Sequence, residues 1–312
     1  AKGREECFYD CAEPTKVVLV LFSDYVGPFA YEKLANIESP VVGGGMEAAS
    51  AIGYSDKLIN GKRDTRTRNV VIHELAHQWF GNAVTENNWD NAWLSEAFAT
   101  CFTLLFIEHQ YGKAEYQSEM ARAKKIFEDY YKKDTSFKIV ASRTAEEEPV
   151  TNYAVTYQKG AWVLLMLREK IGETAFRKGI RSYYKNHFNS NATTEDFIRE
   201  MESVSHQDLH VYFDQWLHRS GEIDIKATWF YDAAKKELTI DLHQPPQKDK
   251  QYGFQLEIGI TGSANSSETI RQYAIHQETT RLSIPCKEMP GKVVLDPNRK
   301  LLANMVLNEK AD

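Results

Sequence analysis

The sequence predicts an α+β protein in which a mainly helical domain precedes a small antiparallel β-sandwich. Up to about residue 220, most apolar residues recur at helical spacing. Beyond that point, short segments alternate apolar and polar residues between turn signals. The chain of 312 residues is long enough for two domains, and we place them at residues 1–221 and 222–312.

The beginning of the chain mixes both kinds of pattern. Thr15 is suited to cap a helix over residues 16–26, although the run Val-Val-Leu-Val-Leu-Phe within it would also suit a strand. A Gly-Pro pair ends this segment. Residues 34–38 and 48–54 are short and strand-like, so we expect a small region of sheet before the main helices.

A series of helices follows. Asp64 is a suitable N-cap for a helix that runs through Trp79 and Phe80. A polar, acidic stretch over residues 134–151 predicts a loop within the series. Helical periodicity also marks residues 92–111, 115–133, 157–171, 173–187, 194–204 and 209–218.

The last third of the chain predicts strands separated by Pro-Pro, Gly-Ser and Pro-Gly pairs. Strands of this length and spacing are typical of a small β-sandwich. The predicted strands cover residues 223–229, 237–242, 254–260, 271–275, 279–284 and 292–295.

Composition excludes several classes of protein. The net charge is −6 and no element carries a cluster of Lys and Arg, which argues against a nucleic-acid partner. The longest apolar runs, residues 17–22 and 101–107, are far too short to span a bilayer. The N-terminus shows no leader pattern. We expect a soluble protein that is cytoplasmic, or exported after removal of a leader, with its oligomeric state left open.

Four cysteines in 312 residues do not make a disulfide framework. Cys7 and Cys11 are close enough in sequence either to bridge locally or to be a free pair. Cys101 lies in an apolar helical run, which favours a small buried side chain.

The most informative motif is His-Glu-Leu-Ala-His at residues 73–77, with Glu96 following after eighteen residues. Two histidines four residues apart project from the same face of a helix, so their ring nitrogens can share one metal ion. Neutral imidazoles suit zinc, and a carboxylate from the next helix as third ligand leaves a position for water. We therefore expect one zinc ion bound by His73, His77 and Glu96.

Glu74 stands beside the expected zinc-bound water and can take its proton as general base, then pass it to a leaving amine. This residue distinguishes the motif from a bare pair of histidines. A second pair, His206 and His210, has no Glu directly after its first histidine and lies in an apolar helical stripe. We interpret that pair as structural.

Four motifs in the same order resemble the aminopeptidase N family of gluzincin metallopeptidases. They are Gly-Gly-Met-Glu at residues 44–47, His-Glu-Leu-Ala-His-Gln-Trp-Phe-Gly-Asn at 73–82, Trp-Leu-Ser-Glu-Ala-Phe-Ala at 93–99 and Tyr-Gln-Lys-Gly-Ala from Tyr157. The resemblance implies a thermolysin-like catalytic domain followed by a small β-sandwich.

The resemblance also implies roles for the matching residues. His73, His77 and Glu96 would bind zinc, and Glu74 would be the catalytic base. Gly44, Gly45, Met46 and Glu47 would bind the peptide substrate, with Glu47 holding its free α-amino group. Tyr157 would donate its hydroxyl to the oxyanion of the tetrahedral intermediate, a contact commonly worth about 3–4 kcal/mol.

The sequence departs from the family pattern at several positions. Ala48 stands where the family usually has Asn, and Ser95 and Ala97 flank the third ligand where Asn and Gly are usual. The family's N-terminal β-domain and C-terminal helical domain have no counterpart in this sequence. We therefore expect that the chain is a piece of a longer protein; if it is a whole protein, its cleft should be more open and should exclude long peptides less well.

We favour a zinc aminopeptidase that removes N-terminal residues from peptides. One alternative is a thermolysin-like zinc endopeptidase, if Glu47 does not hold the amine. Another is a non-catalytic binding domain that has kept zinc, although the residues expected of a catalyst, Glu74 and Tyr157, are both present.

Overall fold

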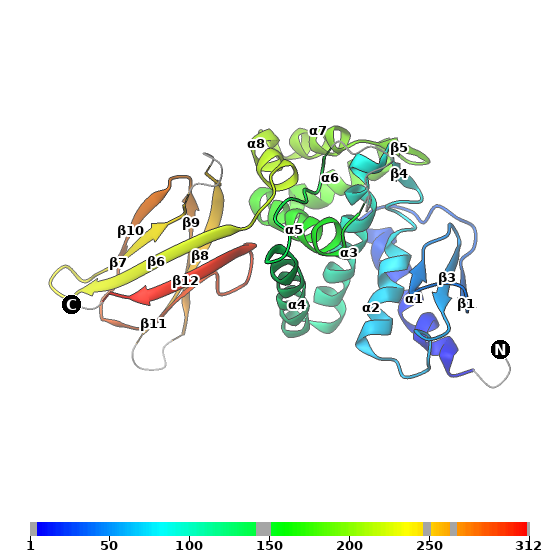
Figure 1. The fold of residues 1–312 in the computed structure, drawn as a ribbon, viewed down its shortest axis with the longest axis horizontal. Coiled ribbons are helices and arrows are strands. Elements are labelled where there is room, and N and C mark those ends of the chain that lie inside the picture. The colour runs from blue at the N-terminus through cyan, green and yellow to red at the C-terminus, as the bar shows by residue number, and fades with distance from the viewer. Residues whose placement is uncertain (1–4, 142–150, 246–250, 263–266, 311–312) are drawn as a thin grey trace. The chain divides into compact units, whose positions relative to one another are not determined.

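The computed structural model describes residues 5–141, 151–245, 251–262 and 267–310 (Figure 1). The chain divides into two compact units, Ala1–Arg219 and Ser220–Asp312. Helices dominate the first and strands the second, which confirms the predicted α+β fold class. The predicted loop over residues 134–151 lies partly outside the described residues. Within the described ranges, no helix is both long and apolar enough to cross a membrane.

Helix α1 (Cys7–Tyr25) begins well before the predicted start at Thr15. The predicted N-cap is therefore wrong, and the hydroxyl of Thr15 instead donates to the carbonyl of Cys11 within the helix (2.6 Å). Pro14 lies inside the helix, where it removes one backbone hydrogen bond. Cys11 and Phe22 are buried on the same face, and this burial favours helix on both sides of the proline.

A three-stranded sheet contains β1 (Ala35–Ser39), β3 (Ala51–Ser55) and β2 (Gly45–Met46), in that order. Strand β1 runs parallel to β3, and β2 runs antiparallel to it. The two predicted strand-like segments overlap β1 and β3. Because β2 lies at the edge of the sheet, the Gly-Gly-Met-Glu segment has a neighbouring strand, β3, on one side only.

Helices α2 (Thr65–Ala76) and α3 (Trp93–Tyr111) pack together in the first unit. Trp79, just after α2, is fully buried. The ring of Phe22 packs edge-on against Trp79 and Phe102, with ring centroids 5.7 and 5.3 Å apart. Edge-to-face aromatic packing of this kind holds α1, the end of α2 and α3 together.

The other helical elements of the first unit include α4 and α5, which both pack on α3. The strands β4 and β5 form a parallel pair. They were not predicted, because three residues are too few to show an alternating pattern. The bounds are β4 (Val84–Glu86), the 3₁₀ turn η1 (Trp89–Asn91), α4 (Lys113–Tyr131), the π-helix η2 (Tyr153–Lys159), α5 (Gly160–Ile171), α6 (Glu173–Asn186), β5 (Ser190–Ala192), α7 (Thr194–Ser205), α8 (His210–Phe213) and the π-helix η3 (Asp214–His218).

The described residues of the second unit form two sheets with strand orders β10-β7-β6-β12 and β11-β8-β9. Most pairs are antiparallel, as expected. The last strand pairs parallel to β6 and was not predicted. The bounds are β6 (Ile223–Asp232), β7 (Glu237–His243), β8 (Phe254–Gly262), β9 (Thr269–Ile275), β10 (Thr279–Pro285), β11 (Pro290–Leu295) and β12 (Ala303–Glu309).

All four cysteines are free. Burial raises the pKa of the Cys11 thiol to about 12 and the pKa of Cys101 well above its usual value. Because the thiolate is the reactive form, we expect iodoacetamide at about pH 8 to modify the partly exposed Cys286 and to spare Cys11 and Cys101 until the protein is denatured. Peptide mass spectrometry measures this; equal modification of Cys101 and Cys286 in the folded protein would contradict it.

Candidate active site

The segment that leads into α2 is held by a buried carboxylate. Asp10 is 3% exposed and accepts three hydrogen bonds of 2.6–2.9 Å from the backbone N–H groups of Asn60, Gly61 and Arg63. Asp64 then caps the helix by accepting from the backbone N–H of Thr67 (2.8 Å), so the predicted N-cap is confirmed. These contacts fix where α2 starts.

His73 lies in the last turn of α2, and His77 is its C-cap. The helix thus ends before Trp79 and Phe80, and the predicted extension through them is wrong. Gly81 has a φ of +112°, which lets the chain turn away. The backbone N–H of His77 still donates to the carbonyl of His73 (3.2 Å), so the two rings project from successive turns on one side.

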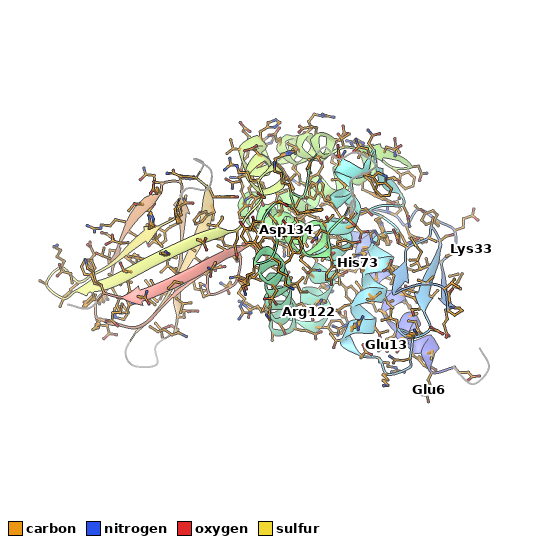
Figure 2. All side chains as sticks on the ribbon, in the orientation of Figure 1. Glu6, Glu13, Lys33, His73, Arg122 and Asp134 are labelled. Atoms are coloured by element: carbon orange, nitrogen blue, oxygen red, sulfur yellow. The ribbon has the colours of Figure 1, made fainter. Side chains whose placement is uncertain are left out.

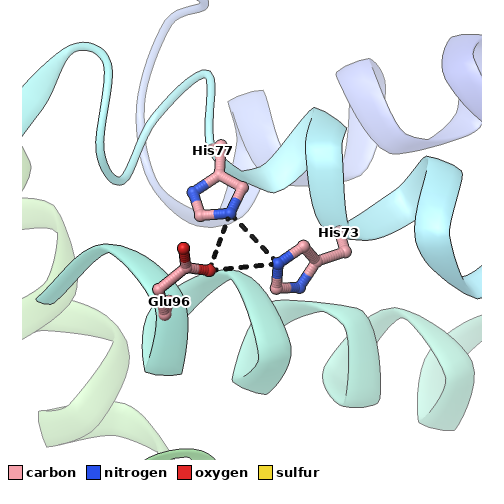
Figure 3. Close-up of side chains that lie close together, drawn as sticks. All are labelled: His73, His77 and Glu96. Carbon is pink, nitrogen blue, oxygen red and sulfur yellow. Dashed lines mark hydrogen bonds and ion pairs between the residues drawn. The ribbon is translucent and has the colours of Figure 1, made fainter. Parts of the chain in front are cut away.

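Three ligand atoms from α2 and α3 meet at one place (Figure 3). The Nε2 atoms of His73 and His77 are 3.1 Å apart, and Oε2 of Glu96 lies 3.3 and 3.2 Å from them. His73 lies within the helical unit, away from the N-terminal end that Glu6 marks (Figure 2). In the part of the chain that the structure describes, no other group of three such side chains is close enough to share an ion.

These separations fit a zinc ion. Tetrahedral ligands at about 2.0–2.1 Å from an ion lie about 3.3 Å from one another, close to the three distances between the ligand atoms. Oε2 of Glu96 is also buried and, among the described residues, has no hydrogen-bond partner besides its contacts with the two imidazole nitrogens. A buried carboxylate oxygen is costly unless a positive charge meets it, and a cation between the three atoms would supply that charge. The donor set and its spacing therefore suit a metal.

The second ring nitrogen of His77 is also held. Its Nδ1 lies 3.0 Å from the carbonyl of Phe80 and 3.1 Å from Oγ of Ser95. A carbonyl can only accept, so Nδ1 carries a proton and Nε2 is the nitrogen left to bind an ion. A Cβ at Gly81 would lie 2.4 Å from Oγ of Ser95, so glycine is needed for this close approach.

The carboxylate of Glu74 packs against the backbone of Gly45. A Cβ at position 45 would lie 2.1 Å from Oε1 of Glu74. Burial raises the pKa of Glu74; the two imidazoles lower it, and Glu47 and Glu96 raise it, with a net rise. A raised pKa suits a carboxyl group that must accept a proton and return it.

Tyr157 lies in the π-helix η2, a distortion that often occurs at functional sites. Its ring stacks on that of His73, with centroids 5.9 Å apart and planes inclined by 18°. The ring of Tyr153 is 5.4 Å away on the same helix. Burial, and then the carboxylate of Glu96, raise the pKa of Tyr157 well above its usual value. The phenol therefore stays protonated at neutral pH and is able to donate.

The segment that carries Glu47 is tied to the turn after α2. The backbone carbonyl of Glu47 accepts from Nδ2 of Asn82 (2.6 Å) and Nε2 of Gln78 (3.1 Å). Oε1 of Gln78 in turn accepts from the backbone N–H of Ser50 (2.9 Å). Two amides that follow the His-Glu-Leu-Ala-His motif thus hold the segment expected to bind substrate.

Gly44 and Met46, the other residues predicted to bind substrate, lie at the edge of the candidate site. Met46 is 46% exposed, and a Cβ at Gly44 would find no atom within 4 Å.

His206 and His210, interpreted above as structural, are both exposed and outside the three-ligand cluster. His210 lies 3.8 Å from Glu202.

Comparison with known proteins agrees with this geometry. The Peptidase family M1 domain matches residues 12–216. The chain belongs to peptidase family M1. It is 30% identical over 274 residues to glutamyl aminopeptidase of Rattus norvegicus, covering 84% of this chain and 29% of that protein. It is also 30% identical over 216 residues to aminopeptidase M1 of Arabidopsis thaliana, covering 65% and 24% respectively. The M1 chain spans less than a third of the length of these relatives.

A solved structure shows the same fold. The crystal structure of Legionella pneumophila aminopeptidase A in complex with aspartic acid matches 97% of this M1 chain and 35% of that chain, with a TM-score of 0.79 and 18% identity. The M1 match and the curated relatives, with which this fold agrees, confirm the resemblance to the aminopeptidase N family.

Two departures of this M1 domain from the family pattern have a local explanation. Ser95 contacts the ring of His77, as described above. Ala97 faces Gly160, where a Cβ would lie 2.5 Å from the Ala97 methyl, so the glycine leaves room for the alanine side chain.

Sequence reasoning missed Gln78, Asn82 and Ser95 as parts of the site. Their only signal was their place inside the quoted motifs: Gln78 and Asn82 belong to the motif at residues 73–82, and Ser95 belongs to the motif at residues 93–99. Helical periodicity does not reveal them, because each acts on backbone or a ring from another segment.

Proposed function

We propose that this M1 domain hydrolyses the N-terminal peptide bond of peptides as a zinc-dependent aminopeptidase. The observation that carries the proposal is the triangle of His73, His77 and Glu96, whose ligand atoms have the spacing of a zinc site. Two imidazoles and one carboxylate favour zinc over a hard cation such as Mg²⁺. We assign one ion to each chain.

The residues around the metal site have different roles in the reaction. When bound, the ion would polarise the scissile carbonyl and acidify the attacking water. Glu74 accepts a proton from that water and later donates it to the leaving amine, and its packing against Gly45 keeps the carboxylate in place. Tyr157 donates its hydroxyl to the oxyanion of the tetrahedral intermediate.

Glu47 provides the preference for an N-terminus. Its partly exposed carboxylate offers a charge-assisted partner to the free α-ammonium group of a peptide. An ammonium held there places the first peptide bond next to the three-ligand cluster. The neighbouring segment of Gly44, Gly45 and Met46 gives the substrate access to backbone. We further propose residues 1–221 as the catalytic domain and 222–312 as a β-sandwich domain, in line with the two compact units.

A methyl group at position 45 is expected to disturb the base. In Gly45→Ala the new Cβ occupies the place of the Glu74 carboxylate, so kcat/KM on an aminoacyl reporter should fall at least about tenfold, with zinc content unchanged. Gly43→Ala is the matched control, because a Cβ there meets no atom within 4 Å. Equal activities of the two variants would show that the Gly45–Glu74 contact does not matter.

A panel of aminoacyl reporter substrates tests the proposed function. Hydrolysis should disappear after treatment with a chelator and return when zinc is restored. Glutamyl and aspartyl reporters belong in the panel, since relatives of this chain are named glutamyl aminopeptidase. An N-acetylated peptide should resist cleavage; if it is cleaved as fast as the free peptide, the protein is an endopeptidase.

A further inference from the structure

A buried amide links the metal-binding helix to the segment of Glu47. Gln78 directly follows His77 and is fully buried. Its Nε2 donates to the carbonyls of Glu47 (3.1 Å) and Glu74 (3.4 Å), and its Oε1 accepts from the N–H of Ser50 (2.9 Å). One side chain thus joins the helix that carries the base and two metal ligands to both ends of the loop over residues 47–50.

Besides Gln78, the loop is held by Asn82 and by backbone hydrogen bonds from Ala51 N–H to the carbonyl of Ala48 and from Ala35 N–H to the carbonyl of Ser50, both 2.9 Å. Glu47 follows the two-residue edge strand β2, and Ser50 adopts a left-handed backbone conformation with φ of +59°. Such a conformation is unfavourable for a residue other than glycine and persists only where its surroundings impose it. The N–H of Ser50 is the group that Gln78 holds. Ala48, at the middle of the loop, has no side-chain polar group to supply a substitute.

We propose that Gln78, assisted by Asn82, is the positioning residue that sets the distance between the Glu47 carboxylate and the metal ligands, and so makes the site selective for a free N-terminus. The inference rests on the proposed function. Gln78 acts through the backbone of Glu47 and touches no substrate. Loss of its hydrogen bonds should weaken recognition of the ammonium group while sparing binding to the metal.

The test uses two ligands that differ only at the amine. A phosphinic dipeptide analogue with a free amino group and its N-acetylated form both bind a zinc ion through the phosphinate, and calorimetry on the zinc-loaded protein gives both dissociation constants. In Gln78→Met we expect the free-amine analogue to bind about tenfold more weakly, which corresponds to about 1.4 kcal/mol. The dissociation constant of the acetylated analogue should change by less than about twofold, which is less than the loss of one weak hydrogen bond would cause.

Two further variants keep the test decisive. Gln244→Met is the matched control, because Gln244 is also buried and also bridges backbone groups, accepting from Tyr252 N–H and donating to the carbonyls of Tyr252 and Gln277, but in the second unit. It should leave the ratio of the two dissociation constants unchanged. Asn82→Ala removes the other donor to the carbonyl of Glu47 at a less buried place, and it substitutes for Gln78→Met if that variant does not fold.

The possible outcomes distinguish amine anchoring by Glu47 from the positioning role of Gln78. A wild-type protein that binds both analogues equally overturns amine anchoring by Glu47 and this inference with it. A wild-type preference that survives in Gln78→Met and Asn82→Ala overturns the role of Gln78 alone. An equal loss of affinity for both analogues, or loss of zinc, also overturns it, because Gln78 would then act on the metal site as a whole.

Discussion

Replacement of Glu74 by Gln is expected to lower kcat by about 1000-fold, the scale on which a positioned general base contributes. Glutamine has nearly the same size, so it fits the space against Gly45, but its amide cannot take a proton from water. Glu74 is not one of the three ligands, so zinc content should remain that of the wild type. Measurement of kcat on an aminoacyl reporter, together with metal analysis, checks both expectations.

Glu86→Gln is a suitable control for that variant. Glu86 lies on β4, and burial raises its pKa as it does that of Glu74. The control removes a comparable carboxyl group that has no role in the proposed reaction, so most of the activity should remain. If Glu74→Gln kept as much activity as Glu86→Gln, Glu74 would not be the base.

Replacement of Tyr157 by Phe should lower kcat by about 100-fold or more, with a much smaller effect on KM, because an oxyanion donor acts mainly in the transition state. Phenylalanine keeps the stacking on His73, so the ring geometry beside the metal ligands is preserved. Steady-state kinetics on one reporter separate the two constants.

Tyr153→Phe provides the matched comparison. Tyr153 lies on the same π-helix, its ring is 5.4 Å from that of Tyr157, and it is 54% exposed. Loss of its hydroxyl should leave kcat nearly unchanged. An unchanged kcat in Tyr157→Phe, or an equal fall in both variants, would show that the Tyr157 hydroxyl does not meet the oxyanion.

The sequence predicted those parts of the site that depend on local spacing. His73 and His77 meet because residues four apart share a helix face, and Asp64 caps that helix as expected. The same reasoning located most strands of the second unit, since alternation survives wherever one face is buried. That Glu96 would reach the histidines followed from the motif and not from periodicity.

The remainder depends on contacts between distant segments. The approach of Gly45 to Glu74 and the hydrogen bonds of Gln78 to residues 47–50 join elements about thirty residues apart, and a single sequence carries no signal for them. The continuation of α1 through Pro14 reflects tertiary burial that overrides local propensity. The parallel pairing of β12 with β6 likewise brings the end of the chain beside the first strand of its unit.

The central claim is that one ion at His73, His77 and Glu96 makes this chain a peptidase. Titration of zinc into the chelated protein, while release of the N-terminal residue from a peptide is followed, tests it most directly. We predict that the rate rises in proportion to added zinc up to one equivalent per chain and then levels off, and that Glu96→Gln abolishes this response. Full hydrolysis before any zinc is added, or none at any zinc concentration, would contradict the account.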